Sequence, residues 1–140
     1  MLFIGSVQGG PEVATALVGK AESRLMNVVD QVVGDFAIGS TSALNIVFHI
    51  PGSMAPNVGY DGLRDGKFSR EEKLLTIQVA VPKEIAVCDD EETILNFLFD
   101  SLRKANRIAA KYFKKKGMEY SQPKYLGLVD AVEHQMRQQA

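Results

Sequence analysis

Two segments in the middle of the chain alternate large apolar residues with polar or smaller ones. The first runs from Leu44 to Ile50, and the second from Leu74 to Val81. Because successive side chains of a strand point to opposite faces of a sheet, each segment is predicted to form a β-strand with one apolar face and one half-polar face. The β-branched residues of the second segment favour strand over helix. We expect the two strands to pair in antiparallel fashion.

Three other segments carry apolar residues at the three- and four-residue spacing of amphipathic helices. The first begins at Pro11, which suits the first position of a helix, and ends near Gly34. The second runs from Asp89 to Lys116, with acidic residues at its start and lysines at its end, the order that the helix dipole favours. The third begins beside Pro123. The last third of the chain is therefore predicted to be helical.

The order of these segments predicts the fold class. A short apolar run from Leu2 to Val7 indicates a first strand, and residues 36–38 allow one further short strand. We predict one α+β domain over residues 1–140, in the order β-α-β-β-α-α, with helices covering one face of a small, mostly antiparallel sheet. The expected core includes Phe48, Ile77, Val79, Leu98 and Leu102.

The connection from Pro51 to Glu72 is long for a link between two strands of a compact domain. It is rich in glycine and charge, and its Asp61-Gly62 and Asp65-Gly66 pairs are interpreted as tight turns. It also contains apolar residues that a disordered linker lacks: Met54, Val58, Tyr60, Leu63 and Phe68. Binding residues concentrate on loops that a rigid scaffold holds in place. We therefore predict that this connection is an ordered recognition surface.

Composition narrows the class of protein. The hydrophobic fraction of 46% and the charged fraction of 24% are close to those of soluble globular proteins. The net charge of −1 gives no reason to expect nucleic acid or an anionic membrane as the main partner. Cys88 is the only cysteine, so a reducing compartment fits best. The opening residues lack the basic region of a signal peptide, and we expect a cytoplasmic protein.

Few residues offer chemistry. Cys88 precedes a helix start, which can lower a thiol pKa, but four acidic residues follow it and oppose the thiolate, so we interpret it as structural. His49 and His134 show no metal-ligand spacing, and neither a metal nor a cofactor is predicted. His49 shares the half-polar strand face with Asn45. We interpret His49 as a hydrogen-bonded histidine at the rim of the sheet, with a ligand-binding role as the alternative.

A basic run follows in the second half of the chain. Between Arg103 and Lys124 there are eight Lys or Arg against one Glu. This charge could contact phosphate, but no aromatic platform interleaves with the lysines as single-strand binders require. We predict a solvated helix end that matches the helix dipole, and we rank a nucleic-acid role third among the functions considered.

Three stretches carry a resemblance to a known class of proteins. They run from Val47 to Ser53, from Tyr60 to Arg70, and along the next strand to Pro82, and together they cover about a quarter of the chain. This region resembles the small immunity proteins of bacterial polymorphic-toxin systems. The resemblance implies a cytoplasmic single domain that neutralises a cognate toxin by binding it, without catalysis.

We therefore predict a non-catalytic protein-binding domain and no enzyme activity. The residues predicted to bind the partner are Tyr60, Asp61, Arg64, Lys67, Phe68, Arg70 and His49. The alternative is a small-molecule-binding domain or small enzyme that uses the outer sheet face around His49. The sequence leaves open whether the chain also forms a homodimer.

Overall fold

The computed structural model describes residues 2–4, 17–32, 43–49, 63–69 and 73–138. These residues form strands and helices in the order β1 (Leu2–Ile4), α2 (Leu17–Val32), β2 (Ala43–His49), β3 (Leu63–Ser69), β4 (Leu74–Ala80), α3 (Lys83–Ala86), α4 (Glu91–Lys115) and α5 (Gln122–Gln138). Helices are thus combined with one sheet, in keeping with the predicted α+β class. The predicted short strand at residues 36–38 lies outside the described residues.

The sheet has the strand order β1-β2-β4-β3. Strands β1, β2 and β4 are parallel to one another, and β3 is antiparallel to β4. The predictions of a mostly antiparallel sheet and of an antiparallel β2–β4 pair are therefore wrong. Both predictions failed because they lacked strand β3. The chain reverses direction once between β2 and β3 and again between β3 and β4. Two reversals leave β4 running in the same direction as β2.

Strand β3 also corrects the prediction that residues 51–72 form a loop throughout. Its sequence, LRDGKFS, contains residue types that are depleted in strands, which hid the strand in the hydrophobic pattern. The register between β3 and β4 shifts between Asp65 and Phe68. Since a glycine inside a strand often marks a bulge, the Asp65-Gly66 pair belongs to this irregularity and not to the predicted tight turn. With β3 and α3 included, the observed order is β-α-β-β-β-α-α-α.

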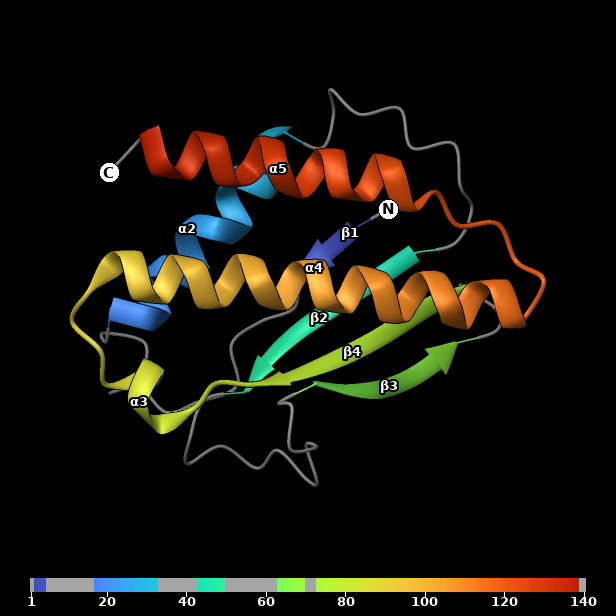
Figure 1. The fold of residues 1–140 in the computed structure, drawn as a ribbon, viewed down its shortest axis with the longest axis horizontal. Helices are drawn as coiled ribbons and strands as arrows, with labels where there is room; N and C mark the ends of the chain where they lie inside the picture. Colours follow the sequence, from blue (N-terminus) through green and yellow to red (C-terminus); the bar gives the residue numbers. More distant parts are fainter. Residues whose placement is uncertain (1, 5–16, 33–42, 50–62, 70–72, 139–140) are drawn as a thin grey trace.

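One layer of helices packs on the sheet (Figure 1). Helix α4 lies across β2, β4 and β3, while α5 and α2 contact α4 and each other. The buried side of the sheet alternates along the chain as predicted: Leu75, Ile77 and Val79 are buried, and the residues between them are partly exposed. The five residues predicted for the core are each at most 1% exposed. The hydrophobic pattern therefore identified the face of the sheet that the helices cover.

Candidate functional site

The predicted partner-binding residues fall in two groups. Tyr60, Asp61 and Arg70 lie outside the described residues. Arg64, Lys67 and Phe68 belong to β3, and His49 is the last residue of β2. The structure therefore places four of these seven residues on the sheet, on two strands that both border β4.

The register shows how far apart these positions are. Arg64 lies opposite Gln78 and Phe68 opposite Leu75, while His49 lies opposite Ala80 on the other side of β4. Residues advance by about 3.3 Å along a strand, so Arg64 and Phe68 are separated by about 10 Å along β4. His49 and Arg64 are thus near the same end of the sheet, and Phe68 is nearer the other end. These described positions extend along the sheet and do not converge on one point.

Strand β3 is the edge of the described sheet, with β4 as its neighbour on one side. An edge strand presents backbone N–H and C=O groups to which a strand of another protein can pair. Charged residues and bulges are the features that keep natural edges from pairing indiscriminately. Both occur in β3, which contains Arg64, Asp65 and Lys67 and has the register shift after Asp65. These features therefore restrict which strands can pair with this edge.

The sheet face away from the helices carries a short polar row. The Nδ2 group of Asn45 donates a hydrogen bond of 3.4 Å to Oγ1 of Thr76, and Val47 and Gln78 beside them are partly exposed. Asn45 pairs with Thr76, and Val47 with Gln78, in the parallel β2–β4 register. This face can therefore offer amide and hydroxyl groups to a ligand.

The other residues considered for chemistry are part of the scaffold. Cys88 lies partly buried against the core, and its Sγ accepts a hydrogen bond of 3.4 Å from the backbone N–H of Asp90. His134 is exposed on α5. Within the described residues, no group of three or more His, Cys, Asp or Glu is placed to hold a metal ion. Cys88 and His134 are therefore not part of a metal-binding group among the described residues.

Arginine side chains join α4 to α5 through a chain of ion pairs that sequence reasoning missed. Arg103 contacts Asp130 at 2.9 Å and also Glu133. Arg137 contacts Glu133 at 2.9 Å and Glu92 at 2.8 Å. Burial opposes the charged form of Glu133, but the hydrogen bonds from Arg103 and Arg137 outweigh it and lower its pKa. The carboxylate of Glu133 is therefore the centre of a charged clasp between the two helices.

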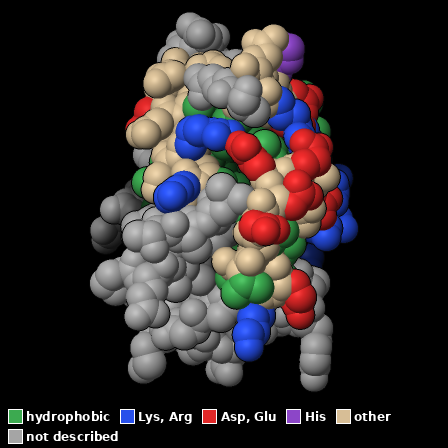
Figure 2. Space-filling view, turned by 90° about the vertical axis from the view of Figure 1, so that its left-hand side faces the viewer, with side chains coloured by type: hydrophobic (Ala, Val, Ile, Leu, Met, Phe, Trp, Pro, Cys, Tyr) green, Lys and Arg blue, Asp and Glu red, His purple; other side chains and the backbone are tan. Residues whose placement is uncertain are grey.

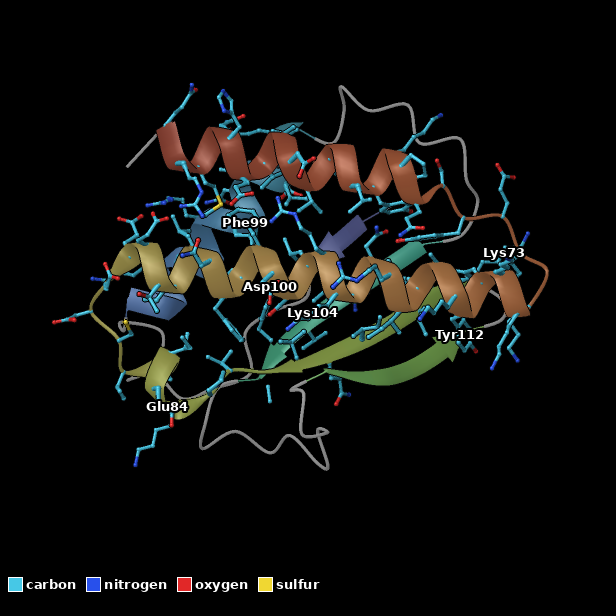
Figure 3. All side chains as sticks on the ribbon, viewed as in Figure 1. Lys73, Glu84, Phe99, Asp100, Lys104 and Tyr112 are labelled. Atoms are coloured by element: carbon cyan, nitrogen blue, oxygen red, sulfur yellow. The ribbon has the colours of Figure 1, made fainter. Side chains whose placement is uncertain are left out.

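A further ion pair on α4 joins Asp100 and Lys104, labelled in Figure 3, at 3.0 Å between exposed side chains. Ion pairs of this exposed kind contribute little to stability. In the same figure, Glu84 marks the end of the molecule where α4 begins, and Tyr112 marks the end where it finishes. The described part of α4 spans 25 residues, or about 37 Å.

The two ends of α4 differ in charge, as the sequence predicted. Glu91 and Glu92 occupy its first turn, and Lys114 and Lys115 its last turn. Figure 2 looks at the end where α4 begins, and Asp and Glu side chains gather over it. Although the net charge of the chain is small, acidic residues are therefore concentrated at the start of α4 and basic residues at its end.

A stack of aromatic rings fills the corner between α4 and α5. The ring of Tyr120 lies 5.2 Å from that of Phe113 and 4.5 Å from that of Tyr125, in nearly parallel orientation. Burial, and secondly the nearby Tyr125, raises the pKa of Tyr120 well above its usual range. Burial raises the pKa of Tyr125 to about 12. Both phenols are thus held neutral in a packed, weakly polar environment.

A cavity of about 470 Å³ opens beside this stack. Its lining comes from the last turns of α4, from the connection to α5, and from the first residue of α5: Ala110, Lys111, Lys114, Met118, Tyr120 and Gln122. Sequence reasoning treated these lysines as a solvated helix end. The sequence signal for the corner was Gly117 directly after the lysines, followed by Met118 and Tyr120, which return toward α4.

Comparisons with protein-family models, with curated proteins and with solved structures find no match to this chain. Among the helices that the structure describes, none has the length and apolar content needed to span a membrane.

Proposed function

We propose that the chain is a non-catalytic protein-binding domain, that its partner docks along β3, and that this partner is a bacterial toxin which the chain neutralises. The observation that carries the docking proposal is the place of β3 at the edge of the sheet, antiparallel to β4. An extended segment of a partner can add to such an edge through main-chain hydrogen bonds, while neighbouring side chains select the partner. Neutralisation then requires only that the bound chain covers the working surface of the toxin.

The toxin as partner is supported by the resemblance of residues 47–82 to immunity proteins, and the cytoplasm is the proposed place of action. Arg64 and Phe68 belong to residue types that occur in interface hot spots or in interface cores. Residues 64 and 68 lie near the two ends of β3, so a short extended segment of the partner that pairs along β3 would pass both. We infer that Arg64 and Lys67 attract an acidic segment of the toxin and fix its register on β3.

The test compares two variants of equal charge change. Arg64→Glu with Lys67→Glu reverses two charges on β3, and Lys20→Glu with Lys124→Glu reverses two exposed charges on α2 and α5. The tagged wild-type chain is first purified from its source cells together with the proteins that bind it. Each co-purified protein is then expressed in a host strain, alone or together with the wild type or one of the two variants. We expect one of them to arrest growth, and we expect the wild type and the Lys20/Lys124 variant to restore growth.

The β3 variant should bind this toxin at least about tenfold more weakly and should protect poorly. Full protection by the β3 variant would contradict docking along β3. If no co-purified protein arrests growth, the toxin part of the proposal fails, even where binding to a protein remains.

The alternative is a small-molecule site on the outer sheet face, which the hydrogen bond between Asn45 and Thr76 favours. Under this alternative, His49→Ala removes ligand binding and leaves the fold intact. Our proposal places the partner on β3 and leaves His49, on β2, out of the docking site. His49→Ala then changes stability by roughly 1 kcal/mol, the scale of one net hydrogen bond, and toxin protection remains. Urea unfolding combined with the growth assay distinguishes the two.

A further inference from the structure

The cavity between the end of α4 and the start of α5 is built by a rigid helix end. Gly117 has φ of +67°, in the left-handed region, and its N–H donates to the carbonyl oxygen of Lys114 at 3.1 Å. The N–H of Met118 donates to the carbonyl oxygen of Phe113 at 2.9 Å. This pair of bonds is the Schellman arrangement, which ends a helix sharply and turns the chain back. Met118 and Tyr120 therefore line the same cavity as the last turns of α4.

The rim of the cavity is positively charged. Lys111 and Lys114 lie three residues apart, so they share one face of α4. Neither forms an ion pair within the described part of the chain, and both are exposed. Gln122, the first residue of α5, adds an amide that can donate hydrogen bonds, and the start of a helix favours negative charge. The groups that meet at this rim thus favour an anion.

Part of the cavity lining is apolar, and it comes from Ala110, Met118 and Tyr120. Two contacts fix the position of Tyr120. Its ring stacks on Tyr125, and its hydroxyl donates a hydrogen bond of 2.6 Å to Oδ1 of Asn106. A compact apolar body can contact these residues while its charged group meets the lysines.

We propose that this cavity binds a small organic anion, in which a carboxylate or phosphate is attached to a compact apolar or aromatic body. The volume of about 470 Å³ falls within the range of about 300–1,000 Å³ that is usual for small-molecule sites. Lys111 and Lys114 bind the anionic group, and Met118 and Tyr120 contact the body. This site lies on α4 and α5 and goes beyond the proposed function, which uses β3.

The test is a titration of the isolated chain with phenyl phosphate, followed by the amide chemical shifts of the labelled protein. Inorganic phosphate and phenol, titrated separately, test the charge and the ring alone. Two double variants are matched in charge and helix end: Lys111→Gln with Lys114→Gln removes the lining lysines, and Lys115→Gln with Lys116→Gln removes two lysines that do not line the cavity. All four residues are exposed, so both variants should fold.

We expect saturable shifts confined to residues 110–122, with phenyl phosphate binding at least about tenfold more tightly than either phosphate or phenol. The Lys111/Lys114 variant should bind phenyl phosphate at least about tenfold more weakly, and the Lys115/Lys116 variant should bind it as the wild type does. Equal weakening in both variants, equal affinity for inorganic phosphate, or shifts spread along α4 without saturation would overturn the proposal. A further titration with a short single-stranded DNA that displaced phenyl phosphate at equal phosphate concentration would also overturn it, in favour of a nucleic-acid site. None of these outcomes bears on docking along β3.

Discussion

The hydroxyl of Tyr120 donates a hydrogen bond of 2.6 Å to the Oδ1 atom of Asn106, whose side chain on α4 is 1% exposed. The two residues are 14 positions apart and are brought together by the sharp end of α4 at Gly117. The Nδ2 group of the same Asn106 has no partner among the described residues. This bond is therefore the polar contact that Asn106 makes in the packed corner between α4 and α5.

Tyr120→Phe should lower the free energy of unfolding by about 1–3 kcal/mol, because it leaves the buried Oδ1 of Asn106 without a donor. Urea unfolding measures the change. Asn106→Leu in the Tyr120→Phe background is the control, since replacing both partners with apolar groups of similar shape is far less costly. Equal losses for Tyr120→Phe alone and for the double variant would contradict this account of the bond.

The clasp around Glu133 predicts a loss of stability in acid. Its pKa is lowered from 4.5 in the folded chain, so the stabilisation that it provides is complete above the unfolded pKa and is lost as the pH falls through the folded pKa. Stability should therefore decrease as the pH drops from about 5 toward 3. Glu133→Gln should cost about 1 kcal/mol at neutral pH and flatten this dependence.

Thermal unfolding at a series of pH values measures the acid effect. Glu84→Gln is the matched control, because Glu84 is exposed on α3, which is not part of the clasp between α4 and α5. This control should keep the wild-type profile. An unchanged acid profile in Glu133→Gln would show that the contacts with Arg103 and Arg137 do not contribute to stability.

Gly117 ends α4 in a left-handed conformation, with φ of +67° and open space where a Cβ would lie. Gly117→Ala should cost about 1 kcal/mol, from backbone strain alone. Gly117→Asn should cost less, because asparagine adopts this conformation more readily. Chemical denaturation of the two variants tests this order. A larger loss for asparagine would indicate a steric conflict that the structure does not contain.

Tyr125 predicts a loss of stability in alkali. Burial raises its pKa to about 12, against about 10 in an unfolded chain. The packing that favours the neutral phenol is therefore fully effective below about pH 10, and its stabilising effect is lost as the pH rises toward 12. The absorbance of tyrosinate should show a late ionisation that Tyr125→Phe reduces. Ionisation of Tyr125 near pH 10 in the folded chain would contradict its burial.

Alternation and helical periodicity predicted β2, β4, α4 and α5 because each has a strongly apolar face. Phe48 and Ile77 on the sheet and Leu98 on α4 are all fully buried, as expected. Periodicity reports which side of an element is covered, and it does not report which strand lies next to which. The parallel direction of β2 and β4 therefore could not be predicted once β3 had been missed.

The candidate sites show the same limit. Arg64, Gly66 and Lys67 are typical of a loop, and only the pairing with β4 makes them a strand. Lys111 and Lys114 look solvated along the sequence, because the residues that complete their cavity follow the turn at Gly117. In both cases the site depends on contacts between segments, which residue order alone does not specify.

Hydrogen exchange of the purified complex with the co-purified toxin tests docking along β3 most directly. The amides of Leu63–Ser69 are followed in the free chain and in the complex, with the amides of α5, Gln122–Gln138, as the internal reference. We predict that binding slows exchange in β3 and leaves α5 unchanged, because added main-chain hydrogen bonds protect an edge strand. Unchanged exchange in β3 together with new protection elsewhere in the chain would contradict the central claim.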